Sequence, residues 1–147
     1  MRYSMRTCPK FAIVLLLLPI LLRPAFAGDL VIVTSADNVE DLQLEDVARI
    51  FLGKVTRYPS GEVVEPLNLD PDDPSYAEFA RKVLNKTPAQ LKAYWAKRIF
   101  TGKGKPPRTI TSSEELRALV SSDKRYLSYL DKNNVDHTVR WVIVLKQ

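Results

Sequence analysis

The sequence predicts an α/β fold in which a mixed sheet is flanked by helices. Short apolar runs rich in valine and isoleucine alternate with longer segments whose apolar residues recur at helical spacing. This alternation of strands and helices is typical of α/β domains with a parallel or mixed sheet. The 147 residues fit one domain, and a composition of 46% hydrophobic and 27% charged residues excludes the disordered, collagen-like and disulfide-rich classes.

The first 27 residues have the three-part layout of an export signal. Three bases open the segment, residues 11–22 form an apolar run, and Ala25-Phe26-Ala27 supplies the small-x-small pattern of a cleavage site. The apolar run is shorter than the ~20 residues that span a bilayer, and a proline interrupts it. We therefore expect cleavage after Ala27, a mature domain at residues 28–147 without a transmembrane segment, and a periplasmic location.

Removal of this signal changes the charge balance. Of the 22 Lys+Arg residues, four lie in the signal, which leaves 18 against 17 Asp+Glu in the mature chain. Such a near-neutral balance gives no indication of a nucleic-acid partner. The one cysteine also lies in the signal, so we expect no disulfide, thiol nucleophile or cysteine metal site after cleavage.

The remaining charges are segregated along the chain. Residues 28–80 carry a net charge of −9, whereas residues 81–108 contain nine bases and no acid. Two interpretations stay open: the charges solvate helices or face one another in the fold, or the bases form a surface that receives an anion or an acidic partner. The bases of that surface would be Lys97, Arg98, Lys103, Lys105 and Arg108.

The first half of the mature chain predicts two strands and a helix. Residues 30–34 form an apolar β-branched run without alternation, which is typical of a strand covered on both faces. Residues 42–52 have apolar positions at helical spacing and are followed by Gly53, a helix stop. Residues 63–69 alternate like a second strand, and Pro66 places that strand at an edge or marks its start.

Two helices are predicted next, each with a recognisable start. Asp73 is a good N-cap with Pro74 at the first helical position, and Thr87-Pro88 begins another helix in the same way. Both helices carry an apolar stripe, which we interpret as core. The buried positions expected are Tyr76, Phe79, Ala80, Val83 and Leu84 in the first helix and Leu91, Tyr94, Trp95 and Ile99 in the second.

The last part of the chain predicts a loop, a helix and two strands. Residues 101–108 form a basic loop rich in glycine and proline. Ser112 or Ser113 caps a helix that runs through Ser121. Residues 126–130 and 139–145 have the apolar character of the final strands.

The sequence contains no recognisable catalytic constellation. His137, the one histidine, lies in a predicted loop, and no Gly-x-Ser-x-Gly setting accompanies it. The aspartates of residues 70–73 lack the spacing of a calcium loop, and residues 101–105 lack that of a phosphate loop. We expect a non-catalytic protein without a metal or a cofactor.

Two places favour a small oxyanion, because ligands of α/β sheets bind where strands end and helices begin. Thr34 and Ser35 end the first predicted strand, and Ser75 and Tyr76 lie in the first turn of the helix after the second. We therefore predict that these four residues bind the ligand.

Two segments resemble phosphate ABC transporter substrate-binding proteins. The first runs from Asp46 to Lys54, with Ile50-Phe51-Leu52-Gly53-Lys54 at its end, followed by Tyr58-Pro59-Ser60-Gly61. The second combines Pro88-Ala89-Gln90, Tyr94-Trp95 and residues 99–108, and it is similar to short, single-domain members of that superfamily. The resemblance covers most of residues 29–131 and implies one lobe of a type II periplasmic binding protein.

The resemblance implies a periplasmic solute-binding protein for phosphate or a similar oxyanion that feeds an ABC permease. The family's Ser-Gly-Thr turn falls at Asp73-Pro74-Ser75, which retains the serine, and its late Gly-Ile-Gly-Tyr strand falls at residues 126–129, which retain Tyr129. The alternative hypothesis is an adaptor or accessory module of an envelope system. In that case another envelope protein contacts the basic segment and phosphate is not bound.

Overall fold

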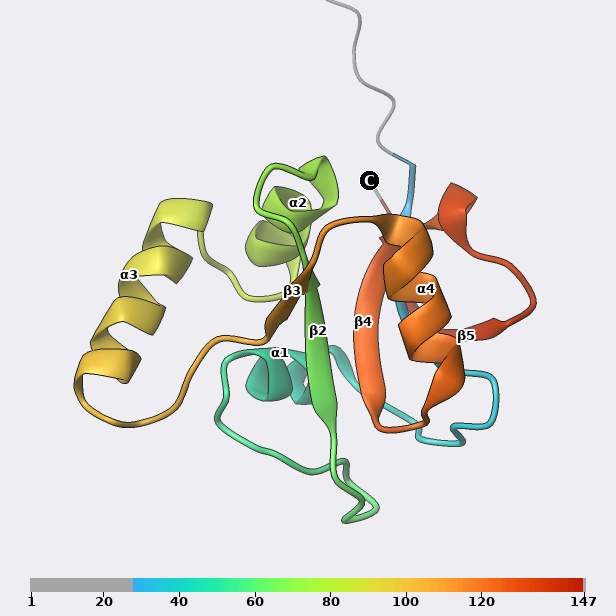
Figure 1. The fold of residues 1–147 in the computed structure, drawn as a ribbon, viewed down its shortest axis with the longest axis horizontal. Coiled ribbons are helices and arrows are strands. Elements are labelled where there is room, and N and C mark those ends of the chain that lie inside the picture. Colours follow the sequence, from blue (N-terminus) through green and yellow to red (C-terminus); the bar gives the residue numbers. More distant parts are fainter. Residues whose placement is uncertain (1–27, 147) are drawn as a thin grey trace, which may run out of the picture.

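The computed structural model describes residues 28–146, which form one five-stranded mixed sheet with helices on both faces (Figure 1). The strands lie in the order β3-β2-β4-β1-β5 and are β1 (Leu30–Ser35), β2 (Glu65–Leu69), β3 (Arg108–Ile110), β4 (Tyr126–Asp131) and β5 (Val139–Leu145). The helices are α1 (Leu44–Phe51), α2 (Pro74–Lys82), α3 (Pro88–Phe100) and α4 (Ser113–Ser122), with a 3-10 turn at η1 (Lys132–Asn134). The predicted fold class is confirmed, while the predicted signal at residues 1–27 lies outside the described part of the chain.

Strand direction decides which loops meet in this sheet. β1 is antiparallel to both of its neighbours, β4 and β5, whereas β2 is parallel to both β3 and β4. Thr34 and Pro66 both pair with Leu127, so the end of β1 is level with the start of β2. The carboxyl ends of β1 and β2 consequently lie at opposite edges of the sheet. Pro66 marks the start of a strand, the second of the two options that the sequence left open.

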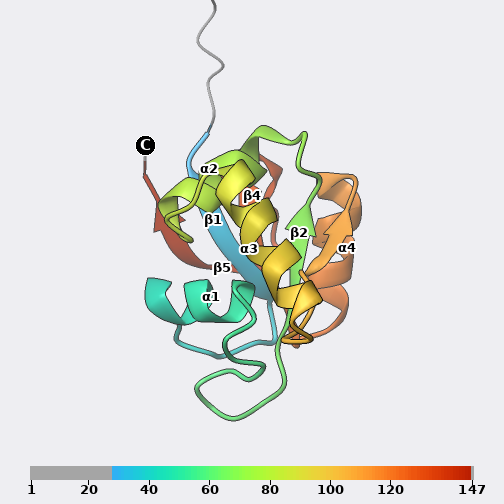
Figure 2. The ribbon, with the colours of Figure 1, turned by 90° about the vertical axis from the view of Figure 1, so that its left-hand side faces the viewer.

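The helices form a layer on each face of the sheet. Figure 2 shows α4 on one side of the sheet, with α1 and α2 on the other and α3 outside α2. Phe51 of α1, Phe79 of α2 and Tyr129 of β4 form an aromatic cluster beneath the second layer. The Phe79 and Tyr129 rings stack with centroids 3.9 Å apart. The Phe51 and Phe79 rings pack edge to face with centroids 4.6 Å apart. This cluster joins two helices to the centre of the sheet.

Three helices begin at the residues that the sequence predicts. The Asp73 carboxylate accepts the Ser75 N–H at 2.8 Å, and the Ser112 hydroxyl accepts the Glu115 N–H at 3.1 Å. At the start of α3, Thr87 and Gln90 exchange two hydrogen bonds in a capping box. Each contact satisfies an amide that the first turn of a helix leaves without a partner. Within residues 28–146, no helix has the length and apolarity to cross a membrane.

Two details differ from the sequence predictions. Arg108, assigned to a loop, begins β3, a three-residue strand too short to produce a recognisable alternation. Ile99, assigned to the core with Leu91, Tyr94 and Trp95, is 56% exposed. The adjacent Phe100 is 92% exposed.

Two phenylalanines provide a matched test of this packing. Phe79→Ala is expected to lower the free energy of unfolding by about 3–5 kcal/mol, because it empties a fully buried site stacked on Tyr129. Phe100→Ala removes the same atoms from an exposed position and should change stability by less than about 0.5 kcal/mol. Urea unfolding followed by circular dichroism measures both, and equal losses would contradict the packing described.

Candidate binding site

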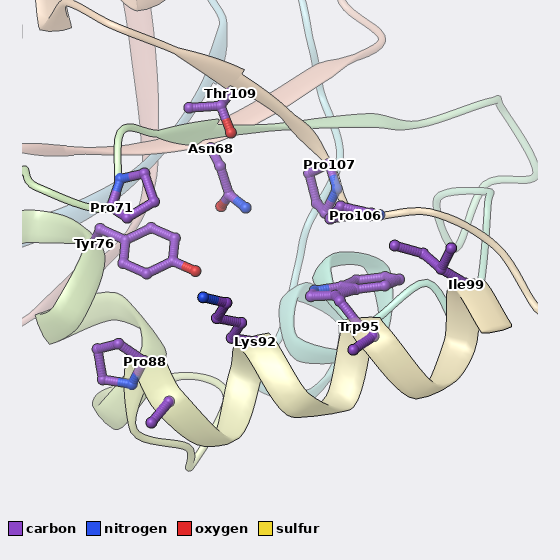
Figure 3. Close-up of a pocket in the computed structure, with 12 residues that line it drawn as sticks. Asn68, Pro71, Tyr76, Pro88, Lys92, Trp95, Ile99, Pro106, Pro107 and Thr109 are labelled. Carbon is purple, nitrogen blue, oxygen red and sulfur yellow. The ribbon is translucent and has the colours of Figure 1, made fainter.

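A groove of about 620 Å³ lies between the start of α2, one face of α3 and the segment that leads into β3 (Figure 3). Its wall is mostly apolar, and four prolines make much of it stiff. The lining residues are Asn68, Pro71, Tyr76, Pro88, Ala89, Lys92, Trp95, Ala96, Ile99, Pro106, Pro107 and Thr109. The groove therefore lies beside the two parallel strands β2 and β3, where α/β sheets commonly bind ligands.

Four hydrogen-bond donors gather at one end of the groove. They are Asn68 of β2, Tyr76 of α2, Lys92 of α3 and Thr109 of β3, and we call them the donor cluster. Asn68 and Thr109 are paired neighbours on adjacent strands, and Figure 3 shows Tyr76 and Lys92 directed toward the same space. Lys92 is the one charged residue of the lining. This arrangement suits a negatively charged group with several acceptor oxygens.

A buried tyrosine fixes the orientation of the Asn68 amide. The Tyr129 hydroxyl accepts the Leu69 N–H at 3.4 Å, so its single proton is donated to Asn68 Oδ1 at 3.3 Å. Burial raises the pKa of Tyr129, which keeps this hydroxyl protonated. Since Asn68 Oδ1 is occupied, the side chain has its NH₂ group left for a ligand. The groove therefore offers a hydrogen-bond donor at this position, which favours a ligand with acceptor oxygens such as an oxyanion.

The structure places Tyr76 in the groove and uses Ser75 in a helix cap. The Ser75 N–H donates to the Asp73 carboxylate, so the start of α2 already holds a negative group of its own. The Asp70 carboxylate accepts the Asp72 N–H at 2.9 Å in the preceding turn, and Asp73 is the N-cap that the sequence predicts.

Thr34 and Ser35 lie at the other edge of the sheet and are buried. The Thr34 hydroxyl donates to the Tyr126 carbonyl at 3.2 Å, and the Ser35 hydroxyl accepts the Asp37 N–H at 3.3 Å. The small cavity beside them, about 110 Å³, is lined by three carboxylates, those of Asp37, Glu40 and Glu62, and by Lys124, which pairs with Glu62 at 2.7 Å. The two predicted places are not brought together, and at this one the acids outnumber the single base, Lys124, which Glu62 already neutralises, so an anion is disfavoured.

The predicted basic residues separate into structural and free groups. The Arg98 guanidinium donates to the Gly53 carbonyl at 2.9 Å and to the Lys103 carbonyl at 2.6 Å, so it holds two loops together. Lys105 and Arg108 line a second cavity of about 410 Å³, on the other side of the shared wall of Trp95, Pro106 and Pro107. Lys97 and Lys103 are exposed and line neither cavity.

Sequence reasoning missed three members of the donor cluster: Asn68, Lys92 and Thr109. A signal existed for Asn68, which interrupts the apolar Leu67-Asn68-Leu69 at the end of a strand and is buried. No comparable signal marked Lys92 or Thr109, since each has an ordinary residue type for its position. The three come together because α3 and β3 pack beside β2.

The fold is that of phosphate ABC transporter substrate-binding proteins, matched over a single lobe. One neighbour is an ABC-type phosphate transport receptor from Vibrio cholerae, with a TM-score of 0.57 and 17% identity over 79% of this chain and 46% of that one. Another is a phosphate ABC transporter substrate-binding protein with bound phosphate from Clostridium perfringens, described as putative. Its TM-score is 0.60, with 16% identity over 79% of this chain and 45% of that one. PstS from Borrelia burgdorferi matches with a TM-score of 0.56 and 18% identity over 81% of this chain and 47% of that one.

The chain spans a little under half the length of these three structures. A scan against protein-family models finds no match, and neither does a search of curated proteins. The likeness at 16–18% identity is therefore one of fold. The predicted resemblance to a single lobe of this class is confirmed.

The hydroxyl of Tyr58, which lies beside Thr34 at the end of β1, is buried, and from this we expect a loss of stability at high pH. Burial, with a smaller effect of Glu40, raises the pKa of its hydroxyl to about 12. The folded state thus holds this proton more tightly than the unfolded state does. The corresponding stability is complete below about pH 10 and is lost as pH rises toward 12, an effect of about 2 kcal/mol. Urea unfolding should show this decline, and Tyr58→Phe should make it shallower, with the remaining slope due to Tyr129, whose pKa burial also raises; an equal slope in both proteins would contradict this assignment.

Proposed function

We propose that the chain is a non-catalytic periplasmic protein of the solute-binding type, which holds phosphate or a similar oxyanion in the donor cluster. Export would use the signal at residues 1–27 with cleavage after Ala27, and an ABC permease would be the partner that receives the ligand. The observation that carries the proposal is the convergence of Asn68, Tyr76, Lys92 and Thr109 at one end of the groove. The fold shared with phosphate-binding neighbours supports the same function.

The chemistry of binding follows from the donors present. An oxyanion at the donor cluster accepts hydrogen bonds from the ammonium of Lys92, the hydroxyls of Tyr76 and Thr109, and the NH₂ of Asn68. Hydrogen bonds to a charged acceptor are shorter and about twice as strong as neutral ones. Because the Asp73 carboxylate caps α2, it already neutralises the partial positive charge at the N-terminus of that helix. Charge compensation of the ligand therefore depends on Lys92.

Two lysines of the same helix make the test. Calorimetric titration with phosphate, with sulfate as the comparison anion, should give saturable binding, and ligand at 100 times its Kd should add about 2.7 kcal/mol to stability. Lys92→Gln is expected to weaken binding about 10- to 100-fold, because a hydrogen bond to a charged group contributes about 1.5–3 kcal/mol.

Lys97→Gln is the matched control, since Lys97 is exposed on α3 but does not line the groove. It should keep the affinity of the parent protein. Absence of both heat and a melting shift up to millimolar phosphate would sink the proposal. Equal weakening by the two substitutions would do the same, because it would indicate a general effect of charge.

A further inference from the structure

The end of α3 exposes two large apolar side chains that are consecutive in the sequence. Ile99 is 56% exposed and Phe100 92% exposed, and both lie next to the loop of residues 101–107. Isolated exposed apolar residues are common, but Ile99 lines a groove whose wall is itself apolar, and Phe100 follows it directly in the sequence. Aromatic side chains, phenylalanine included, are enriched in protein interfaces relative to the rest of the surface.

The same region carries positive charge without compensation. The ion pairs among residues 28–146 are Lys82–Glu78, Arg117–Asp136, Lys124–Glu62 and Arg125–Asp123. Of the nine bases in residues 81–108, Lys82 alone takes part in one of these pairs. Glu65 is the single carboxylate among the side chains that line the groove and the second cavity. The field at this face therefore attracts a negatively charged partner.

The face is concave and stiff, which favours a polypeptide over a flat lipid surface. The groove and the second cavity, about 620 Å³ and 410 Å³, lie on either side of Trp95, Pro106 and Pro107. Each cavity has room for an apolar side chain, and Lys105 and Arg108 line the second. β3 is the edge strand here, with β2 as its one neighbour. Its outer edge offers backbone groups to an added segment.

We propose that this face, formed by the end of α3 and the segment 101–108, docks an acidic polypeptide segment that carries apolar side chains. The apolar side chains enter the two cavities and cover Phe100, while the carboxylates meet Lys103, Lys105 and Arg108. The inference goes beyond the proposed function and does not depend on it, because Phe100, Lys103 and Lys105 lie outside the donor cluster. It favours the acidic-partner interpretation of the charge pattern.

Fluorescence anisotropy with three labelled peptides tests the proposal on the purified protein. The first peptide alternates glutamate with leucine and phenylalanine, the second replaces every glutamate with lysine, and the third replaces every apolar residue with serine. The first should bind at least about tenfold more tightly than either of the others, since charge and apolar contact are both required. Raising the salt concentration should weaken the binding of the first peptide.

Substitutions then locate the binding face. Phe100→Ser and Lys105→Glu should each weaken the first peptide at least about tenfold. Lys146→Glu makes the same charge change at an exposed site after β5 and should leave binding unchanged. Circular dichroism confirms that each variant is folded, which is expected because all three side chains are exposed.

Equal binding of the three peptides would overturn the inference. So would binding of phosphatidylglycerol vesicles without binding of any peptide, which would make the face a membrane contact. Phosphate titration of the same protein is read separately. Peptide binding without phosphate binding sustains the docking face and sinks the oxyanion site, and the opposite result does the reverse.

Discussion

The position of α3 depends on carbonyl groups that follow the end of α1. A helix end leaves its last carbonyls without partners and carries partial negative charge. The Tyr94 hydroxyl donates to the Leu52 carbonyl at 2.7 Å, and the Arg98 guanidinium donates to the Gly53 carbonyl at 2.9 Å. Gly53 has a φ of +64°, and a Cβ there would lie 3.0 Å from the Trp95 ring. Glycine is therefore required both for the turn and for the close approach of α3.

This contact brings together the two segments of the sequence resemblance. Leu52 and Gly53 belong to the first segment and Tyr94 and Trp95 to the second, so the two segments form one interface. The interface fixes the face of α3 that carries Lys92 and Trp95, and this face forms one wall of the groove. Pro106 and Pro107 make the facing wall stiff. A preformed groove loses little conformational entropy when it binds a ligand.

Local features of the sequence were sufficient to predict most helices and strands, because caps and apolar periodicity act within a few residues. Strand direction is not local: nothing in residues 30–35 indicates that β1 is antiparallel to its neighbours. That direction separates Ser35 from Ser75, which a parallel sheet would have placed at one edge. β3 escaped prediction because three residues show no period. The donor cluster combines four elements, so its members meet only once packing is known; Tyr76 alone was predicted.

Binding of the two proposed ligands is coupled, because one of them excludes water from the site of the other. A site on one lobe leaves its ligand partly exposed, whereas binding sites for small molecules usually bury most of the ligand surface. Exposure keeps the effective dielectric high, and this weakens the attraction between Lys92 and an anion. A polypeptide seated against Trp95 and Ile99 covers the groove beside the donor cluster and excludes part of that water. Both ligands are negatively charged, so repulsion between the carboxylates of the segment and the anion opposes this gain, and the net coupling between the two sites acts equally in both directions.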